Sequence, residues 1–162
     1  DLGTPSPGLD FFRKVVTHFP ACTDLITVYS ADRVVGGGFL APFRDTVYCT
    51  WAGLLREFYE QRSSHLLIWE TIQYGCQKGL QWVDLGRCKK GSGGYVFKKD
   101  FGSEGQQLYQ QFYLNGITRP PAVGAGMEDD LKYRLFVDVW RRLPLAITEA
   151  LGPQLRRRMP FG

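Results

Sequence analysis

Hydrophobic positions along the chain change from helical spacing to alternation, and each change predicts a new element. In residues 10–19 (DFFRKVVTHF) the apolar side chains recur at helical spacing, Asp10 is placed to cap the first turn, and Pro20 ends the segment. DLITVYS, VVGGGFLAPF and TVYCTW then read as strands separated by very short turns at 31–33 and 44–45. Three consecutive strands joined in this way predict an antiparallel meander.

A second helix and a further strand are predicted after the meander. Residues 65–79 (HLLIWETIQYGCQKG) are strongly apolar at helical spacing, with Ser63 or Ser64 placed to cap the helix and Gly79 to end it. Residues 80–86 (LQWVDLG) are a short, nearly continuous apolar run. Such a run is typical of a strand in the centre of a sheet that is covered on both faces.

The remainder of the chain predicts a loop, a last strand and two helices. A glycine-rich loop follows residue 86, and residues 106–114 (QQLYQQFYL) alternate like a final strand. Residues 129–143 (DDLKYRLFVDVWRRL) have an apolar side and a charged side, with aspartates at the start and arginines near the end, which favours a helix. Pro144 separates this helix from a shorter one.

The order of elements predicts an α/β (α+β) fold with one mixed and mainly antiparallel central sheet flanked by helices and extended by a helical tail. With 162 residues, 44% of them hydrophobic, the chain is long enough for one core and short for two. We expect residues 1–115 to form the core domain, 116–129 a Pro/Gly-rich linker, and 130–162 a helical extension packed on the core.

Composition narrows the function classes. No apolar run is long enough for a transmembrane segment and the first residues lack the pattern of a signal peptide, so we expect a cytoplasmic protein. The four cysteines form no C-x-x-C pair and there are only two histidines, so we expect reduced thiols and no metal. Five arginines in residues 141–162 favour a solvated basic end over an RNA-binding surface, because no RNA-binding motif accompanies them; tRNA is therefore an unlikely partner.

Several stretches resemble one known family. LGTPSPGLDFFRKV, WAGLLREFYE, HLLIWETIQYGCQKGLQWVDLGR, GSGGYVFKKDFGSE and the tail VWRRLPLAITEALGP resemble the acyltransferase half of FemAB-like proteins, which are relatives of the Fem aminoacyltransferases in the GNAT superfamily. The resemblance covers nearly the whole chain. It implies a single GNAT-like domain and an N-acyltransferase that moves an acyl or aminoacyl group from acyl-coenzyme A, or from an ester carrier, to an amine. The acceptor would be a small molecule or a cell-envelope amine, and a second GNAT-like domain or a homodimer is a possible partner.

The sequence departs from the family pattern at three points. The serine of the family's Phe-Asp-Phe-Gly-Arg-Ser strand end is Cys88, and its Trp-Gly pair is Phe101 and Gly102. The GNAT pyrophosphate loop, Arg or Gln followed by x-x-Gly-x-Gly or Ala, is replaced by EQRSSHLL at 60–67. The missing loop, and the match to only one half of a Fem-type protein, keep open the alternative of a non-catalytic binding module.

The resemblance and the residue types together give three candidate catalytic residues. Lys98 matches the family's Phe-Lys lysine, which implies a role in holding the donor or in stabilising the negative charge that acyl transfer builds on the carbonyl oxygen. Asp84 is a candidate general base, or a structural partner of Arg87, Tyr95 or backbone donors. Tyr95 is a candidate proton donor to the leaving group, or a residue at the rim of the core.

Candidate binding residues flank these. Arg87 follows the predicted strand, where a guanidinium can grip a phosphate or carboxylate; the competing interpretation is a salt bridge with Asp84 or Glu70. His65 we interpret as a helix-surface histidine. The remaining candidates are backbone groups for a phosphate at Ser92, Gly93 and Gly94, a second anion site or plain cap at Ser63 and Ser64, and an acceptor contact at Arg56.

Overall fold

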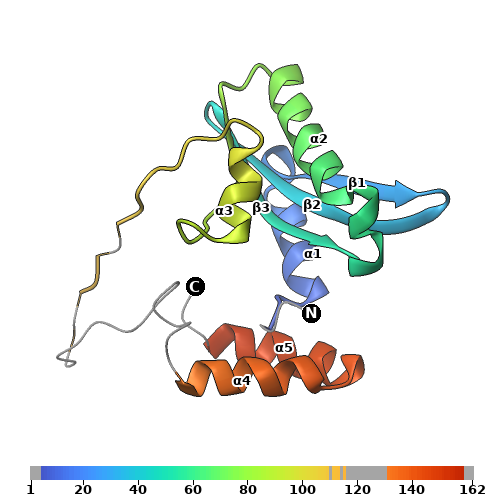
Figure 1. The fold of residues 1–162 in the computed structure, drawn as a ribbon, viewed down its shortest axis with the longest axis vertical. Helices are drawn as coiled ribbons and strands as arrows, with labels where there is room; N and C mark the ends of the chain where they lie inside the picture. Colours follow the sequence, from blue (N-terminus) through green and yellow to red (C-terminus); the bar gives the residue numbers. More distant parts are fainter. Residues whose placement is uncertain (1–4, 110, 114, 116–130, 159–162) are drawn as a thin grey trace. The chain divides into compact units, whose positions relative to one another are not determined.

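The structure, a computed structural model, describes residues 5–109, 111–113, 115 and 131–158. The described chain forms two compact units (Figure 1). One unit is Lys14–Gly102, and the other is made of the described residues of Asp1–Arg13 and Ser103–Gly162. The predicted linker, 116–129, lies outside the described residues.

The Lys14–Gly102 unit is built on a four-stranded sheet. The strands are β1 (Asp24–Ser30), β2 (Arg33–Phe43), β3 (Thr46–Leu54) and β4 (Trp82–Asp84), in the order β1-β2-β3-β4. β1 pairs antiparallel with β2 and β2 with β3, while β4 runs parallel to β3. The antiparallel meander and the mixed, mainly antiparallel sheet are therefore confirmed.

Two bulges interrupt the ladders of the meander. The register passes from Val28↔Gly36 to Tyr29↔Val34, which leaves Val35 as an extra residue in β2. A second shift leaves Thr50 as the extra residue of β3, and its hydroxyl donates to the carbonyl of Phe39 at 3.0 Å. A bulge bends its strand, so the second half of β3 is set at an angle to the first.

Helix α2 (Ser63–Gln77) connects β3 to β4 and lies across one face of the sheet (Figure 1). Leu67 of this helix packs with Val28 and Val35 in the buried core. The predicted end at Gly79 is confirmed: Gly79 is left-handed (φ +68°), and the N–H groups of Gly79 and Leu80 close onto the last turn.

The predicted cap at the start of α2 is wrong. The position before the helix is Arg62, itself left-handed (φ 58°) and without a capping side chain, and Ser63 is the first helical residue. The Ser63 hydroxyl donates instead to the carbonyl of Phe58 at 3.1 Å. Phe58 belongs to the short 3-10 helix η2 (Arg56–Gln61), which precedes α2 in the chain.

Strand β4 has the predicted place along the chain but not the predicted place in the sheet. It is an edge strand of the described sheet, and Trp82 is 64% exposed. Val83, the half-buried residue between exposed Trp82 and Asp84, lies beside Gly75 of α2. A sheet centre, covered on both faces, was therefore the wrong environment for residues 80–86.

The chain after β4 differs most from the prediction. Residues expected to form a loop contain a third helix, α3 (Gly93–Lys99). The last strand predicted at 106–114 is not formed, because the described residues of that stretch belong to no helix or strand. Alternation alone does not make a strand where no partner edge is paired with it.

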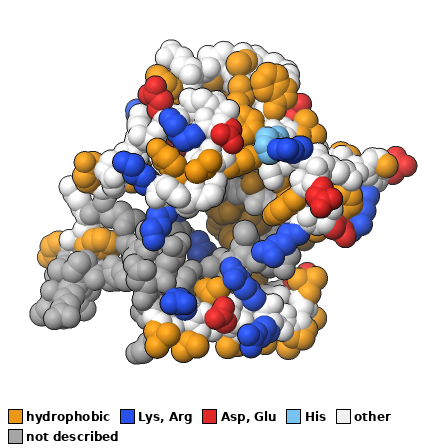
Figure 2. Space-filling view, in the orientation of Figure 1, with side chains coloured by type: hydrophobic (Ala, Val, Ile, Leu, Met, Phe, Trp, Pro, Cys, Tyr) orange, Lys and Arg blue, Asp and Glu red, His pale blue; other side chains and the backbone are white. Residues whose placement is uncertain are grey.

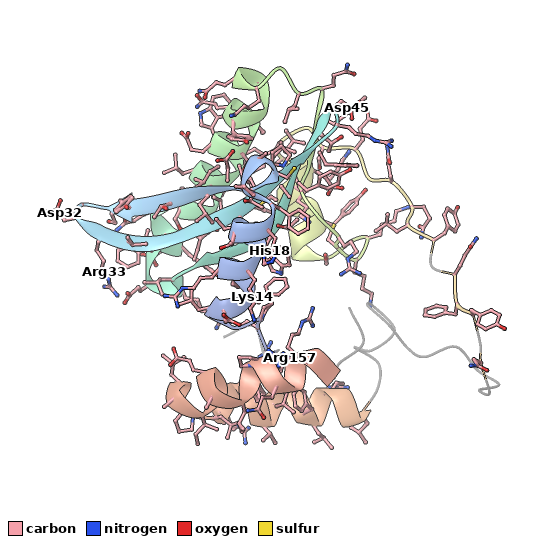
Figure 3. The ribbon with its side chains drawn as sticks, turned by 180° about the vertical axis from the view of Figure 1, so that it is seen from behind. Lys14, His18, Asp32, Arg33, Asp45 and Arg157 are labelled. Atoms are coloured by element: carbon pink, nitrogen blue, oxygen red, sulfur yellow. The ribbon has the colours of Figure 1, made fainter. Side chains whose placement is uncertain are left out.

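Three longer helices confirm the predicted start and tail. α1 (Leu9–His18) begins one residue earlier than predicted, so Asp10 lies in its first turn instead of capping it. Figure 3 shows the Lys14 and His18 end of α1 on the side of the sheet away from α2. In the tail, α4 (Leu131–Arg142) and α5 (Leu145–Arg158) pack around Trp140, which is 8% exposed and stacks on Phe136. Within the described residues, no helix has the length and apolar character needed to cross a bilayer.

Candidate functional site

Strands β3 and β4 part at a fork. Their ladder pairs only Thr46–Tyr48 with Trp82–Asp84, whereas β3 continues to Leu54. Beyond Asp84 the chain turns through Gly86, which is left-handed (φ +76°) and whose built Cβ would lie 3.9 Å from the carbonyl oxygen of Cys49. We call this place, where the ladder ends between Cys49 and Gly86, the fork.

The loop that leaves the fork is held by side chains on both sides of it. The Asp84 carboxylate accepts the Gly86 N–H at 2.6 Å. From α3, the Lys98 ammonium donates to the carbonyls of Gly86 at 2.8 Å and Arg87 at 3.2 Å. Asp84 thus takes the backbone-partner role that was one of its two interpretations, and Lys98 lies beside the fork with two of its hydrogen bonds directed to the loop.

Helix α3 begins at the end of this loop. Gly91 is left-handed (φ +79°), the Ser92 N–H donates to the Lys89 carbonyl at 3.0 Å, and the Ser92 hydroxyl accepts the Tyr95 N–H at 3.3 Å. Ser92 is therefore a helix cap, and its N–H is used within the loop. Gly93 and Gly94 are exposed in the first turn. A phosphate would meet the N–H groups of these glycines before that of Ser92.

Arg87 is exposed on the loop surface. Among the described residues its guanidinium forms no ion pair, so the salt bridge with Asp84 or Glu70 is not seen. Tyr95 is half-buried on α3.

The second group of candidates lies at the junction of η2 and α2. Ser63 is buried, Ser64 is half-buried, and Arg56 is the exposed first residue of η2. The N–H groups of His65 and Leu66 both donate to the Arg62 carbonyl. The earlier N–H groups of a helix have no carbonyl partner in their own helix, and they make its first turn electropositive.

His65 joins the two groups and corrects the prediction of a surface histidine. Its ring is half-buried in the first turn of α2 and lies edge-on to Phe97 at 4.9 Å and tilted to Phe101 at 5.8 Å, both centroid distances. Its Nδ1 atom is buried and has no hydrogen-bond partner. The C-terminal half of α3 is thereby packed against the beginning of α2, close to the candidate anion site.

Cys49 is a fork residue that the sequence did not single out. Burial raises the pKa of its thiol, and the hydrogen bond with Thr71 and the positive charge of Lys98 oppose this effect in part. Thr71 is fully buried on α2 and donates its hydroxyl to the Leu67 carbonyl at 2.8 Å. Cys49 is thus a protonated, largely apolar residue at the fork. The sequence signal that could have identified it is its position two residues after Val47, which places both side chains on the same face of β3.

The structure places the candidate residues in two groups. The first set, on the stretch from β4 through α3, is Asp84, Arg87, Ser92, Gly93, Gly94, Tyr95 and Lys98. The second set, at the start of α2, is Ser63, Ser64 and Arg56.

Comparison with known proteins identifies the family to which the chain is similar. Residues 1–99 match the family model described as "Acetyltransferase (GNAT) domain". No curated protein matches the chain in sequence.

Solved structures of two aminoglycoside acetyltransferases share the fold. Aminoglycoside N-acetyltransferase AAC(6')-Iy in complex with CoA superposes with a TM-score of 0.51 at 11% identity, over 66% of this chain and 92% of that one. An aminoglycoside acetyltransferase from an uncultured soil metagenomic sample, in complex with sisomicin, gives a TM-score of 0.55 at 16% identity, over 68% of this chain and 76% of that one. The same enzyme with trehalose gives 0.54.

Proposed function

The chain belongs to the GNAT family of acetyltransferases, and from that premise we propose that it moves a short acyl group from an acyl-coenzyme A type thioester to an amine by direct attack. The reaction forms a C–N bond and breaks the C–S bond of the thioester. The amine loses one proton and the leaving thiolate gains one, so no covalent enzyme intermediate and no further reactant are required.

The observation that carries this proposal is the fork with a cation beside it. Direct attack needs the thioester and the amine held together, and we assign their meeting point to the place where the β3–β4 ladder ends. Lys98, which bonds to the Gly86 carbonyl at the fork, is the proposed cation for the carbonyl oxygen that becomes negative during transfer. Asp84 is the candidate base for the amine proton, and Tyr95 the candidate acid for the leaving thiolate.

The start of α2 is the proposed anchor for the phosphates of the donor. The sequence there has no glycine loop, but left-handed Arg62 makes the same sharp entry into the helix and leaves the N–H groups of Ser63 and Ser64 at its end. Arg56 lies on the adjoining η2 and adds a cation. A donor bound here would extend along α3 towards the fork.

Close packing under the fork favours a short acyl group. A Cβ built on Gly38 would lie 3.0 Å from Leu67 Cδ1 and 3.5 Å from Cys49 Sγ. Val47 and Thr71 are fully buried beside them. Since protein interiors tolerate little added volume, a long acyl chain has no space between α2 and the sheet.

The finer identity rests on the sequence motifs. The stretches that resemble FemAB-like proteins support an aminoacyl or acyl transfer to a small-molecule or cell-envelope amine, with a second GNAT-like domain or a homodimer as partner. The proposed cytoplasmic location rests on composition, namely the missing apolar run and the expected reduced thiols. The aminoglycoside complexes of the structural neighbours support a small-molecule amine as the acceptor class.

One observation favours the alternative of a non-catalytic binding module. Lys98 and Asp84 both have hydrogen bonds that stabilise the loop 84–87, which is also what a purely structural role would require. In that case the chain would bind the donor without transferring its acyl group.

Release of free thiol during incubation with a panel of acyl-coenzyme A donors and amines tests the proposal. Thermal unfolding with coenzyme A, acetyl-coenzyme A and a long-chain acyl-coenzyme A, followed in parallel, reports binding because a ligand of the folded state raises the midpoint. Thiol release with short donors confirms transfer. A raised midpoint without thiol release selects the binding module, and neither response with any donor refutes both.

A further inference from the structure

Positive charge is concentrated on the segment that leaves the fork. Residues 84–100 hold five lysines and arginines and two aspartates, a net charge of +3 in a chain whose formal net charge is +4. Figure 2 shows Lys and Arg side chains spread over the surface around α3 and the loop before it. We call residues 86–91 the basic loop, with Arg87, Lys89 and Lys90 as its cations.

The basic loop has a shape fixed from within. Gly86 and Gly91 are left-handed at its two ends, and Lys98 and Asp84 bind the carbonyl and the N–H of Gly86. These backbone groups are satisfied by the loop's own neighbours, and Arg87 and Lys90 are exposed. Asp84, the nearest carboxylate in the sequence, is already engaged with the Gly86 N–H.

This basic loop is separate from the proposed phosphate anchor of the donor. The anchor adjoins the C-terminal half of α3, through His65 with Phe97 and Phe101, whereas the basic loop precedes the N-terminus of the same helix. A helix of seven residues is about 10 Å long, close to one Debye length at 0.1 M salt. Lys98 links the first residues of the loop to the C-terminal half of α3, whereas Lys90 lies next to the N-terminus of the helix. We therefore assign Arg87 and Lys90 to a second ligand at the fork and the start of α2 to the donor's phosphates.

Building on the proposed function, we propose that the basic loop makes the site select an amine acceptor that itself carries a phosphate or a carboxylate, and disfavour polycationic amines. An anionic group beside Arg87 and Lys90 gains charge-assisted hydrogen bonds, and Arg87 can bind it in bidentate fashion. A polycationic acceptor, such as the sisomicin in the complex of the soil enzyme, would meet like charge at the same place. The fold is shared with that enzyme, and the acceptor class differs.

Four amines that differ in charge test this. They are glucosamine, glucosamine 6-phosphate, muramic acid and sisomicin, each followed both by binding calorimetry and by acyl transfer from acetyl-coenzyme A at low and high salt. We expect the phosphate or the carboxylate compound to have a Kd and a KM lower than those of glucosamine by about tenfold or more, the difference that one charge-assisted hydrogen bond provides. The better of the two identifies the anionic group, and added salt should reduce the preference.

Charge reversal localises the effect. The double variant Arg87→Glu with Lys90→Glu should remove the preference for the anionic amines. The matched control, Arg44→Glu, changes an exposed arginine in the turn at the other end of β4 and should keep it. Thermal midpoints check that both variants fold.

Each outcome decides a different statement. Equal binding of glucosamine and its anionic relatives, or tighter binding of sisomicin, overturns the inference even if acyl transfer is measured. A preference that persists unchanged in the double variant also overturns it. An anion preference that depends on Arg87 and Lys90, without acyl transfer, retains the anion site and rejects the transferase.

Discussion

Replacing Lys98 by methionine separates the structural role of this residue from its proposed catalytic role. The change keeps the length of the side chain and removes the ammonium that bonds to the Gly86 carbonyl at 2.8 Å and the Arg87 carbonyl at 3.2 Å. Hydrogen bonds of charged groups contribute roughly 1.5–3 kcal/mol each when sheltered, and much less when solvent screens them. Lys98 is only half-buried, so the two together should contribute about 1–2 kcal/mol to the free energy of unfolding.

Urea unfolding tests the structural role of Lys98, and steady-state kinetics on the same preparations test its catalytic role. Lys99→Met is the matched control, because it removes the same charge from the next, more exposed position of α3. We expect Lys98→Met to lower the free energy of unfolding clearly more than the control does, and to lower kcat with acetyl-coenzyme A by about tenfold or more. If the two variants unfold at the same urea concentration, the reasoning from the loop contacts is wrong. If stability falls while kcat and KM stay at the unmutated values, Lys98 is a structural residue and its assignment to the reaction fails.

Three further substitutions and one labelling experiment test other parts of the structure. Leu67→Ala should lower the free energy of unfolding in urea by about 2–4 kcal/mol, because it empties a core site where Leu67 is only 4% exposed, and a loss below about 1 kcal/mol would contradict that packing. Burial, and then the hydrogen bond and charge of Asp24, raise the pKa of Tyr74 to about 12. Folding therefore favours the protonated phenol, so the free energy of unfolding should fall as the pH rises from 10 to 12. In Tyr74→Phe this fall should be weaker when unfolding is measured across the same pH range. His65→Phe keeps the ring contacts and removes a buried, unpartnered nitrogen, so its thermal midpoint should be equal or higher, and a clear drop would show that the nitrogen has a partner. Burial raises the pKa of the Cys49 thiol, so iodoacetamide should label this residue slowly in the folded chain at pH 8 and rapidly in urea, as followed by mass spectrometry.

The parts of the fold that the sequence predicts well are those decided within a few residues. The meander follows from alternation and short turns, and the end of α2 follows from Gly79, the residue type that adopts a left-handed conformation without strain. α1, α2 and α4 were recognisable because apolar residues sustained over ten or more positions at helical spacing seldom occur outside a helix. The helix after Pro144 was predicted as the shorter of the two in the tail, but α5 has 14 residues and α4 has 12.

The errors concern features decided by distant contacts or by competing local signals. The run at 80–86 predicts a strand, but its place at the sheet edge depends on which strands lie beside it. Phe97 in α3 and Phe101 just after it are spaced one helical turn apart, and this signal was outweighed by three glycines, of which Gly91 precedes the helix and Gly93 and Gly94 form its first turn. The residues of 106–114 alternate as strands do, yet alternation does not provide a neighbouring edge to pair with.

The candidate site shows the same division. Sequence motifs brought attention to Asp84, Arg87 and Lys98, and the structure places them at the end of β4, on the loop that follows, and on α3. Their partners were not predictable, because Asp84 and Lys98 bind backbone groups, and every residue has the same backbone. His65 was missed for a related reason, since its aromatic neighbours on α3 are more than thirty positions away in the chain.

Gly75 lets α2 lie directly against the sheet. A Cβ at this position would lie 3.4 Å from both Val47 and Val83, so the helix rests directly on the two strands at the place where they are still joined. The opposite end of the same helix, at Ser63, is twelve residues or about 18 Å away. A larger side chain at position 75 would tilt α2 away from the two strands. Because the helix is stiff, its N-terminal end at Ser63, where the donor is expected to bind, would move the most.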